Sequence, residues 1–159
     1  MIQTDYLIVG AGAASMAFCD TLFTNQPDAD ITIVDQHARP GGHWQDAYDF
    51  CQLHQPSLLY GVESAQMEGS WLKLIATGQI PWKHRASKSE ILAYYTKLMD
   101  QWVQSGRVHY FPNAAYDFEG SDLENQRHVI RFDRTEQTVC ARVKFVDGTV
   151  GECRVPSKT

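Results

Sequence analysis

Residues 7–18 read LIVGAGAASMAF, an apolar run followed by two glycines and a stretch of small side chains. A Gly-x-Gly-x-x-Gly pattern between a strand and a helix is typical of a dinucleotide-binding unit. Gly10, Gly12 and Ser15 occupy its three positions. The first glycine permits a tight turn, the second lets the backbone approach a pyrophosphate, and the third position needs a small residue where helix and strand pack closely. Serine nearly meets that last requirement.

The flanking sequence supplies the strands and the helix that this pattern requires. Residues 5–10 (DYLIVG) are typical of a buried parallel strand, residues 13–23 of a buried helix, and residues 31–35 (ITIVD) of a second strand. The second strand ends in Asp35, close to the ~20 residues after the glycines at which a ribose-binding acid is expected. We therefore predict a strand–helix–strand dinucleotide-binding unit over residues 4–36, and not a glycine turn that binds nothing.

The bulk composition narrows the class of protein. A length of 159 residues, with 43% hydrophobic and 21% charged residues, predicts one ordinary globular domain. The net charge of −5 argues against a nucleic-acid partner, which usually selects a basic face. A small basic cluster remains at Lys83, His84, Arg85 and Lys88. We interpret it as the solvated entrance of a helix, with a phosphate contact as the alternative.

The cysteines and the N-terminus indicate in which cellular compartment the protein is expected. Cys19, Cys51, Cys140 and Cys153 show no C-x-x-C spacing, which predicts neither a metal site nor a disulfide framework but reduced thiols in a cytoplasmic protein. The apolar N-terminus lacks a basic leader and carries Asp5, so we interpret it as a strand and not as a signal peptide. No apolar run is long enough to span a membrane, and we predict no membrane partner.

Residues 37–69 have poor periodicity and many aromatic side chains, which is typical of an ordered loop that lines a pocket. Its aromatic and histidine residues are Trp44, Tyr48, Phe50, Tyr60, His43 and His54. Taken one at a time, most of these aromatic residues fit packing over the sheet, and a lone histidine is more often a core residue than a catalyst. We therefore assign no catalytic residue.

The rest of the chain predicts two helices, a third parallel strand and a meander. Residues 70–78 have helical spacing, and residues 87–106 begin with a capping box formed by Ser87 and Glu90. The second helix carries an apolar stripe that predicts a core face, made of Ile91, Leu92, Tyr95, Leu98, Met99, Trp102 and Val103. Residues 107–111 predict the third strand, within a unit spanning residues 70–112. Residues 113–159 alternate around the turn signal DGTV and predict an antiparallel β-meander.

These elements predict an α/β, Rossmann-like fold with a parallel sheet and a small antiparallel meander. Further parallel strands would complete such a domain, and we find no sequence for them, so we expect the domain to be incomplete. An open sheet edge would then favour self-association.

At this level of detail the sequence resembles a known family. Residues 4–61, with the fingerprint and the segment PGGHW at residues 40–44, are similar to the N-terminal region of FAD-dependent oxidoreductases with two dinucleotide-binding domains. PGGHW resembles the Gly-Gly-x-Trp segment of flavin-containing monooxygenases and their Baeyer–Villiger relatives. The likeness continues more weakly to the end of the chain. It implies an FAD/NAD(P)-binding domain with FAD as the cofactor and NAD(P)H as co-substrate.

The resemblance also implies which residues bind the cofactor. Gly10, Gly12, Ala13 and Ala14 would approach the pyrophosphate, with Ser15 at the helix start. Asp35, with Gln36 beside it, would accept the adenosine ribose hydroxyls. Gly42, His43 and Trp44 would lie beside the ribityl chain or the flavin.

The chain also departs from the family pattern. Serine replaces the third glycine, Asp35 stands where glutamate is more common, and Asp49 replaces a proline. The family's second glycine motif and its C-terminal flavin-contacting strand are absent from these 159 residues.

Three functions follow as alternatives. The first is the FAD-binding portion of a monooxygenase-like flavoenzyme that passes electrons from NAD(P)H through FAD to oxygen or a small substrate, in which the isolated chain is inactive. The second is a non-catalytic module that binds the ADP moiety. The third is a dehydrogenase domain that binds NAD directly.

Overall fold

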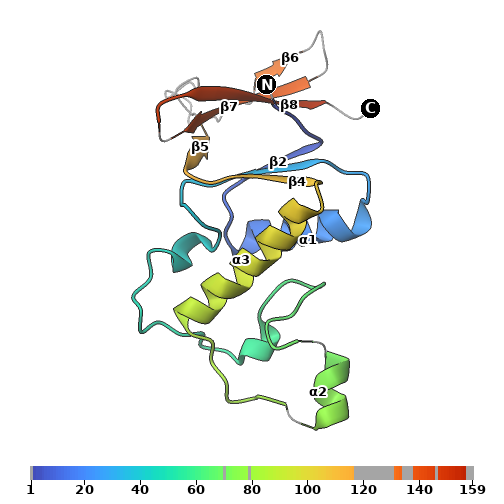
Figure 1. Cartoon of the computed structure of the whole chain (residues 1–159), viewed down its shortest axis with the longest axis vertical. Coiled ribbons are helices and arrows are strands. Elements are labelled where there is room, and N and C mark those ends of the chain that lie inside the picture. Colours follow the sequence, from blue (N-terminus) through green and yellow to red (C-terminus); the bar gives the residue numbers. More distant parts are fainter. Residues whose placement is uncertain are drawn as a thin grey trace.

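The computed structural model describes residues 2–69, 71–78, 80–116, 131–133, 138–145 and 147–156. Its elements, in chain order, are β1 (Ile2–Gln3), β2 (Tyr6–Val9), α1 (Ala13–Asn25), β3 (Ile31–Val34), the 3-10 turns η1 (Gly42–Trp44) and η2 (Ser57–Leu59), α2 (Trp71–Thr77), α3 (Lys88–Gln104), β4 (Val108–Phe111), β5 (Ala114–Tyr116), β6 (Arg131–Asp133), β7 (Thr138–Phe145) and β8 (Val150–Pro156). Figure 1 shows α1 and α3 against one side of the β2–β4 layer and the β7–β8 ribbon on the other side.

The predicted strand–helix–strand unit is present. Strands β2, β3 and β4 form a three-stranded parallel sheet in the order β2-β3-β4, with Tyr6 paired to Ile31 and Ile31 paired to Val108. The central strand β3 is buried along its whole length, as a continuous β-branched run predicts. The Rossmann-like fold expected from the sequence is therefore confirmed.

Helix α1 packs on the sheet through its larger apolar side chains. Met16, Cys19 and Leu22 are buried in the main core together with residues of β2 and β3. Its C-terminal end is held by the guanidinium of Arg107, which donates to the carbonyls of Phe23, Gln26 and Pro27 at 2.7–3.0 Å. These bonds satisfy carbonyls that a helix end leaves without a partner.

Helix α3 begins at the predicted capping box. Ser87 Oγ accepts from the backbone N–H of Glu90, and Glu90 accepts from the backbone N–H of Ser87 at 2.8 Å. The predicted core stripe holds for five of its seven residues, which are Ile91, Tyr95, Leu98, Met99 and Trp102. Leu92 is only partly buried and Val103 is 42% exposed, because the stripe is wider than the face that the sheet covers.

The second sheet contains the predicted antiparallel strands and, in addition, short strands that the sequence did not predict. It contains β5, β6, β7 and β8 in antiparallel pairs, but β1 joins it in parallel to β8, with Ile2 opposite Cys153. Strands β1 and β5 were not predicted from the sequence, because both are very short. Residues 117–130 and 134–137 lie outside the described residues, so before β7 the predicted meander is seen only at β5 and β6.

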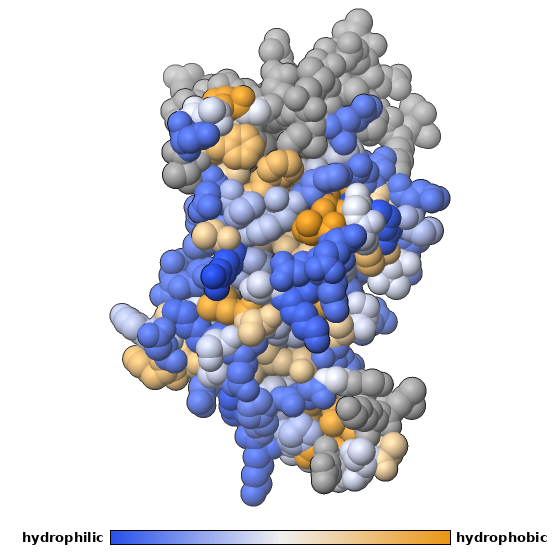
Figure 2. All heavy atoms as spheres, in the orientation of Figure 1, coloured by the Kyte–Doolittle hydropathy of each residue, from blue (hydrophilic) through white to orange (hydrophobic). Residues whose placement is uncertain are grey.

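Apolar side chains on the surface are spread over several elements. Figure 2 shows a face that is mainly hydrophilic, with scattered apolar patches. In the described part of the chain no helix has the length and apolar character needed to cross a membrane. Strand β2 lies at the edge of the parallel sheet, and Val9 there is half exposed. Self-association through this edge stays a prediction.

Candidate functional site

A cavity of about 440 Å³ lies at the carboxyl ends of β2 and β3. In parallel α/β sheets this is the edge at which ligands bind. Six of the ten predicted cofactor residues line it, namely Gly10, Gly12, Asp35, Gln36, Gly42 and His43. The cavity lining does not include Ala13, Ala14, Ser15 or Trp44, while it does include His37 and Asp46, which the sequence analysis did not single out.

Gly10 and Gly12 of the glycine loop line the cavity, as the fingerprint predicts. Gly10 has φ +91°, a conformation that side chains strain, and its N–H donates to the Val34 carbonyl at 2.7 Å. A Cβ atom on Gly42 would lie 2.8 Å from the Cα of Gly12. Gly10 therefore needs glycine for its turn, and Gly42 needs glycine because a side chain there would meet the backbone of Gly12.

The N-terminus of α1 faces this loop without a side-chain cap. Its N-cap residue is Gly12, and its first turn holds no acidic residue. The leading N–H groups of a helix have no partner within the helix, and they carry partial positive charge. This end of α1 therefore suits an anionic group such as a phosphate. Ser15 lies one turn in, with its Oγ 4.0 Å from where a Cβ of Gly10 would stand.

Asp35 ties the glycine loop to the end of β3. Its side chain is 4% exposed, and Oδ2 accepts from the backbone N–H of Ala11. Oδ1 accepts from the backbone N–H of His37 at 2.7 Å. The carboxylate is thus held by two backbone donors in the position expected for the ribose-binding acid.

His37 extends this arrangement to the rim of the cavity. Its Nδ1 lies 2.9 Å from Asp35 Oδ1, and its Nε2 lies 3.0 Å from Asp46 Oδ2. Burial lowers the pKa of His37, but the hydrogen bonds to Asp46 and Asp35 outweigh it and raise the pKa above its usual value. The sequence offers little sign that His37 and Asp46 belong to the site, because only the fold of residues 37–46 brings Asp46 back to the imidazole.

Trp44 packs into the core beneath the cavity. Its indole N–H donates to the Tyr60 hydroxyl at 3.2 Å, and Tyr95 donates to the same hydroxyl at 2.9 Å. The neighbouring His43 is exposed, with its ring 5.2 Å from the indole. A role of Trp44 beside a flavin stays a prediction, whereas its packing role is visible in these contacts.

The aromatic residues of the 37–69 segment divide into two groups. Trp44 and Tyr60 pack inward, while Tyr48 and Phe50 are strongly exposed and stack on each other with ring centroids 5.4 Å apart. The segment is anchored at its far end, where Ser64 donates to the buried Asp20 from its backbone N–H and its hydroxyl.

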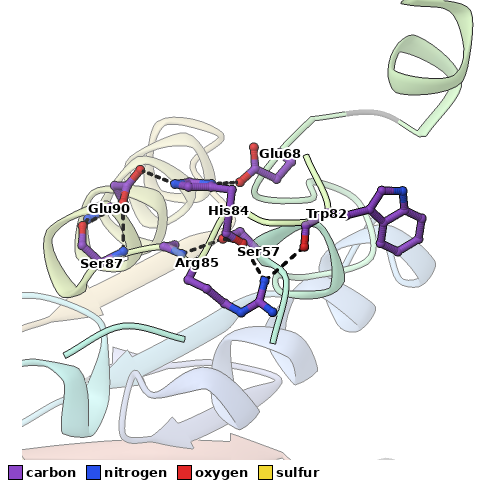
Figure 3. Close-up of polar contacts among 8 residues, drawn as sticks. Ser57, Glu68, Trp82, His84, Arg85, Ser87 and Glu90 are labelled. Atoms are coloured by element: carbon purple, nitrogen blue, oxygen red, sulfur yellow. Dashed lines mark hydrogen bonds and ion pairs between the residues drawn. The ribbon is translucent and has the colours of Figure 1, made fainter. Parts of the chain in front are cut away.

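The basic cluster serves contacts within the chain. Figure 3 shows the His84 ring between the carboxylates of Glu68 and Glu90, while Arg85 donates to backbone carbonyls, among them that of Trp82. Lys88 donates to the Ala47 carbonyl at 2.7 Å. These bonds occupy donors of His84, Arg85 and Lys88 within the chain, which supports the interpretation as a helix entrance.

The described residues provide neither a metal centre nor, at Cys19, a reactive thiol. Within them no group of three His, Cys, Asp or Glu side chains could hold a metal ion. Cys19 and Cys51 are free thiols, and burial, followed by the charge of Asp20, raises the pKa of Cys19 to about 12. A thiol with that pKa stays protonated and is a poor nucleophile.

The chain matches a family model and several curated proteins. Residues 8–63 match a family model described as an NAD(P)-binding Rossmann-like domain. Uncharacterized proteins from Mycobacterium tuberculosis and Mycobacterium bovis are each 39% identical over 160 residues, covering 98% of this chain and 28% of the relative. The chain thus spans less than a third of the length of the curated relatives it matches.

Several solved structures share the fold. A flavin-containing monooxygenase from Stenotrophomonas maltophilia has a TM-score of 0.61 at 18% identity, covering 96% of this chain and 37% of that one. A bacillithiol disulfide reductase from Bacillus cereus has a TM-score of 0.67 at 12% identity, with coverage of 96% and 37%. A cyclohexanone monooxygenase mutant from Rhodococcus sp. Phi1, bound to NADP+, has a TM-score of 0.60 at 18% identity, with coverage of 98% and 25%. The resemblance to the nucleotide-binding portion of flavin monooxygenases is thereby confirmed at the level of the fold.

Proposed function

We propose that the cavity above the glycine loop binds the ADP moiety of FAD, and that this chain is the FAD-binding portion of a monooxygenase-like oxidoreductase. The contact between Gly12 and Gly42 carries the proposal. Because Gly42 has no side chain, its backbone meets that of Gly12, and both residues line a cavity at the carboxyl ends of the strands, between a helix N-terminus and a buried carboxylate.

The residues of the cavity fit the two ends of an ADP group. Gly10, Gly12 and the leading N–H groups of α1 would hold the phosphates, with Ala13, Ala14 and Ser15 supplying backbone donors. Asp35, at the end of β3, would accept from the ribose, with Gln36 beside it. Gly42 and His43 would continue the site toward the flavin, with Trp44 packed beneath them.

When bound, FAD supplies the redox chemistry, which moves electrons from NAD(P)H to oxygen or to a small substrate. This chain's residues bind and orient the adenosine half of the cofactor. The remaining steps belong to the longer protein that the relatives represent. The free thiols of Cys19 and Cys51 fit a reducing, cytoplasmic setting.

Two alternatives remain open beside this function. A module that binds only ADP would use the same cavity without catalysis. An NAD-dependent dehydrogenase would place NAD there, and the Asp35 carboxylate would then disfavour the 2′-phosphate of NADP. The fold shared with flavin monooxygenases supports FAD over both, as does the Gly-Gly-x-Trp segment at residues 41–44.

An absorption spectrum and equilibrium binding measurements distinguish the three candidate functions. The chain is purified, scanned in the visible range, and titrated in parallel with FAD, ADP and NAD. The proposal expects FAD to bind more tightly than ADP, with a flavin spectrum displaced from that of free FAD. Equal binding of FAD and ADP would favour the ADP module, and preference for NAD would favour the dehydrogenase domain.

A further inference from the structure

The acceptor capacity of Asp35 is largely used by the protein itself. An ionised carboxylate offers about four acceptor positions. The backbone N–H of Ala11 takes one of them on Oδ2, and the backbone N–H and the ring Nδ1 of His37 take both positions on Oδ1. A ribose with two adjacent hydroxyls therefore finds a single free position on Oδ2, unless one of the present donors leaves.

The ring of His37 is the donor that can leave. The two backbone N–H groups are fixed by the glycine loop and by the end of β3, and they orient the carboxylate without help from the imidazole. The ring is a side chain at the rim, and it is held on its far side by Asp46, which is 75% exposed. His37, Asp35 and Asp46 all line the cavity.

The present position of the ring requires both of its protons. Carboxylate oxygens are acceptors only, so an imidazole that bonds to Asp35 through Nδ1 and to Asp46 through Nε2 must donate from both nitrogens. A neutral imidazole carries one N–H and can keep only one of the two bonds. By turning from Asp35 to Asp46 the neutral ring gives up one hydrogen bond, whereas the protonated ring would give up an ion pair with a buried carboxylate. The other ionisable groups near this cluster are His43 on the cavity wall and Tyr110 on β4, whose pKa is raised by burial and then by Asp35, so Tyr110 stays neutral.

We propose that the protonated imidazole of His37 blocks the ribose-facing side of Asp35, so that the cavity binds adenosine nucleotides more tightly once His37 loses its proton. The inference rests on the proposed function, because it concerns the same cavity. The two ribose hydroxyls replace the ring Nδ1–H on Oδ1 and fill the free position on Oδ2. By linkage, binding near neutral pH releases part of a proton from His37.

The test is equilibrium titration with ADP at about pH 6 and about pH 8.5 for the natural chain and for His37→Ala. This substitution removes the ring and keeps the backbone N–H that orients Asp35. At about pH 6 we expect His37→Ala to bind ADP about tenfold more tightly than the natural chain, and at about pH 8.5 the two affinities converge.

A second variant and a control make the test independent of any effect on folding. Asp46→Asn changes an exposed residue, and NMR titration should show the pKa of His37 lowered, with ADP affinity at about pH 6 raised toward that of His37→Ala. His109→Gln removes another imidazole that lies 3.2 Å from a carboxylate oxygen, that of Asp30, and should keep the natural pH profile.

Different outcomes test the block by His37 and the binding of ADP in the cavity separately. Equal or weaker ADP binding by His37→Ala at about pH 6, in a chain that does bind ADP, overturns the block and leaves the proposed function standing. Absence of ADP binding at every pH in every variant overturns the proposed function and this inference with it. Proton release on ADP binding to the natural chain, measured in buffers of different ionisation enthalpy and absent in His37→Ala, supports the block.

Discussion

Gly42 lies in direct backbone contact with Gly12, and a Cβ atom on Gly42 would come within 2.8 Å of the Gly12 Cα. The contact joins the PGGHW segment to the glycine fingerprint, two sequence features that lie some distance apart in the chain. Gly42 also has φ +54°, which favours glycine in its own right. Both features of the proposed cofactor site therefore depend on one pair of residues.

The first prediction concerns this pair. Gly42→Ala should abolish ADP binding and lower the free energy of unfolding by more than the ~1–2 kcal/mol expected of a left-handed residue alone. The matched control is Gly106→Ala, because Gly106 also has positive φ but nothing within 4 Å of its Cβ position. Urea unfolding and ADP titration of both variants give the comparison. Equal destabilisation of the two, with ADP binding retained, would show that the contact does not shape the cavity.

The second prediction concerns Asp35. Asp35→Ala removes the ribose acceptor and leaves the backbone N–H groups of Ala11 and His37 without their partner. ADP affinity should fall about tenfold or more, since charge-assisted hydrogen bonds contribute about 1.5–3 kcal/mol. Asp35→Asn keeps one acceptor oxygen and should be less destabilised in urea. An unchanged ADP affinity in Asp35→Ala would remove this carboxylate from the site.

The third prediction concerns Ser15, where the fingerprint has its third glycine. Ser15→Gly should preserve ADP binding, because smallness is the main demand where α1 approaches the turn at Gly10. Ser15→Leu should force the helix from the strand, at about 1–3 kcal/mol of overpacking. Thermal unfolding and ADP titration report the two effects. A leucine variant that melts and binds like the natural chain would contradict close packing here.

The fourth prediction concerns pH and stability. The hydrogen bond that His84 donates to the Glu68 carboxylate raises the pKa of His84, against the lowering effect of burial, and Glu90 adds to it. A histidine whose folded pKa lies above its unfolded value of about 6.5 stabilises the fold below that pH, and this stability is lost as pH rises through the folded pKa. His37 acts with the same sign. The free energy of unfolding should therefore fall between about pH 6 and about pH 8.5.

Urea unfolding of two variants isolates the share of His84. His84→Gln should flatten the pH dependence of stability, leaving the part due to His37. His54→Gln, at an exposed position on the neighbouring loop, should keep the natural slope. Parallel slopes for His84→Gln and the natural chain would rule out the carboxylate pair as the cause.

The parts of the fold that the sequence predicts are those set by local pattern. The strand, glycine turn, helix and strand of residues 4–36 are adjacent in the chain, and the capping box at Ser87 marks the start of α3 directly. Strand β1 could not be predicted, because its two residues gain their structure from pairing with β8 at the far end of the chain.

The candidate site, too, could be predicted only where local pattern determines the structure. Glycine and Asp35 positions follow from spacing, but the positions of His37, Asp46 and Trp44 depend on how residues 37–46 fold back over the sheet. Trp44 could equally have faced the cavity, and its inward orientation depends on core packing and on the bond to the Tyr60 hydroxyl, which local sequence does not show. The prediction that Val103 belongs to the core was wrong, because helical periodicity shows which face of a helix is apolar but not how much of that face is covered.

NMR mapping shows at the level of single residues whether the cavity over the glycine loop binds the ADP moiety. Backbone amide shifts of the isotopically labelled chain are followed during titration with ADP. The account predicts saturable changes at Gly10, Gly12 and Ser15, at Asp35 and His37, and their loss in Gly42→Ala. Saturable changes centred instead on the separate cavity beside Met67 and Lys97, or no changes at all, would contradict it.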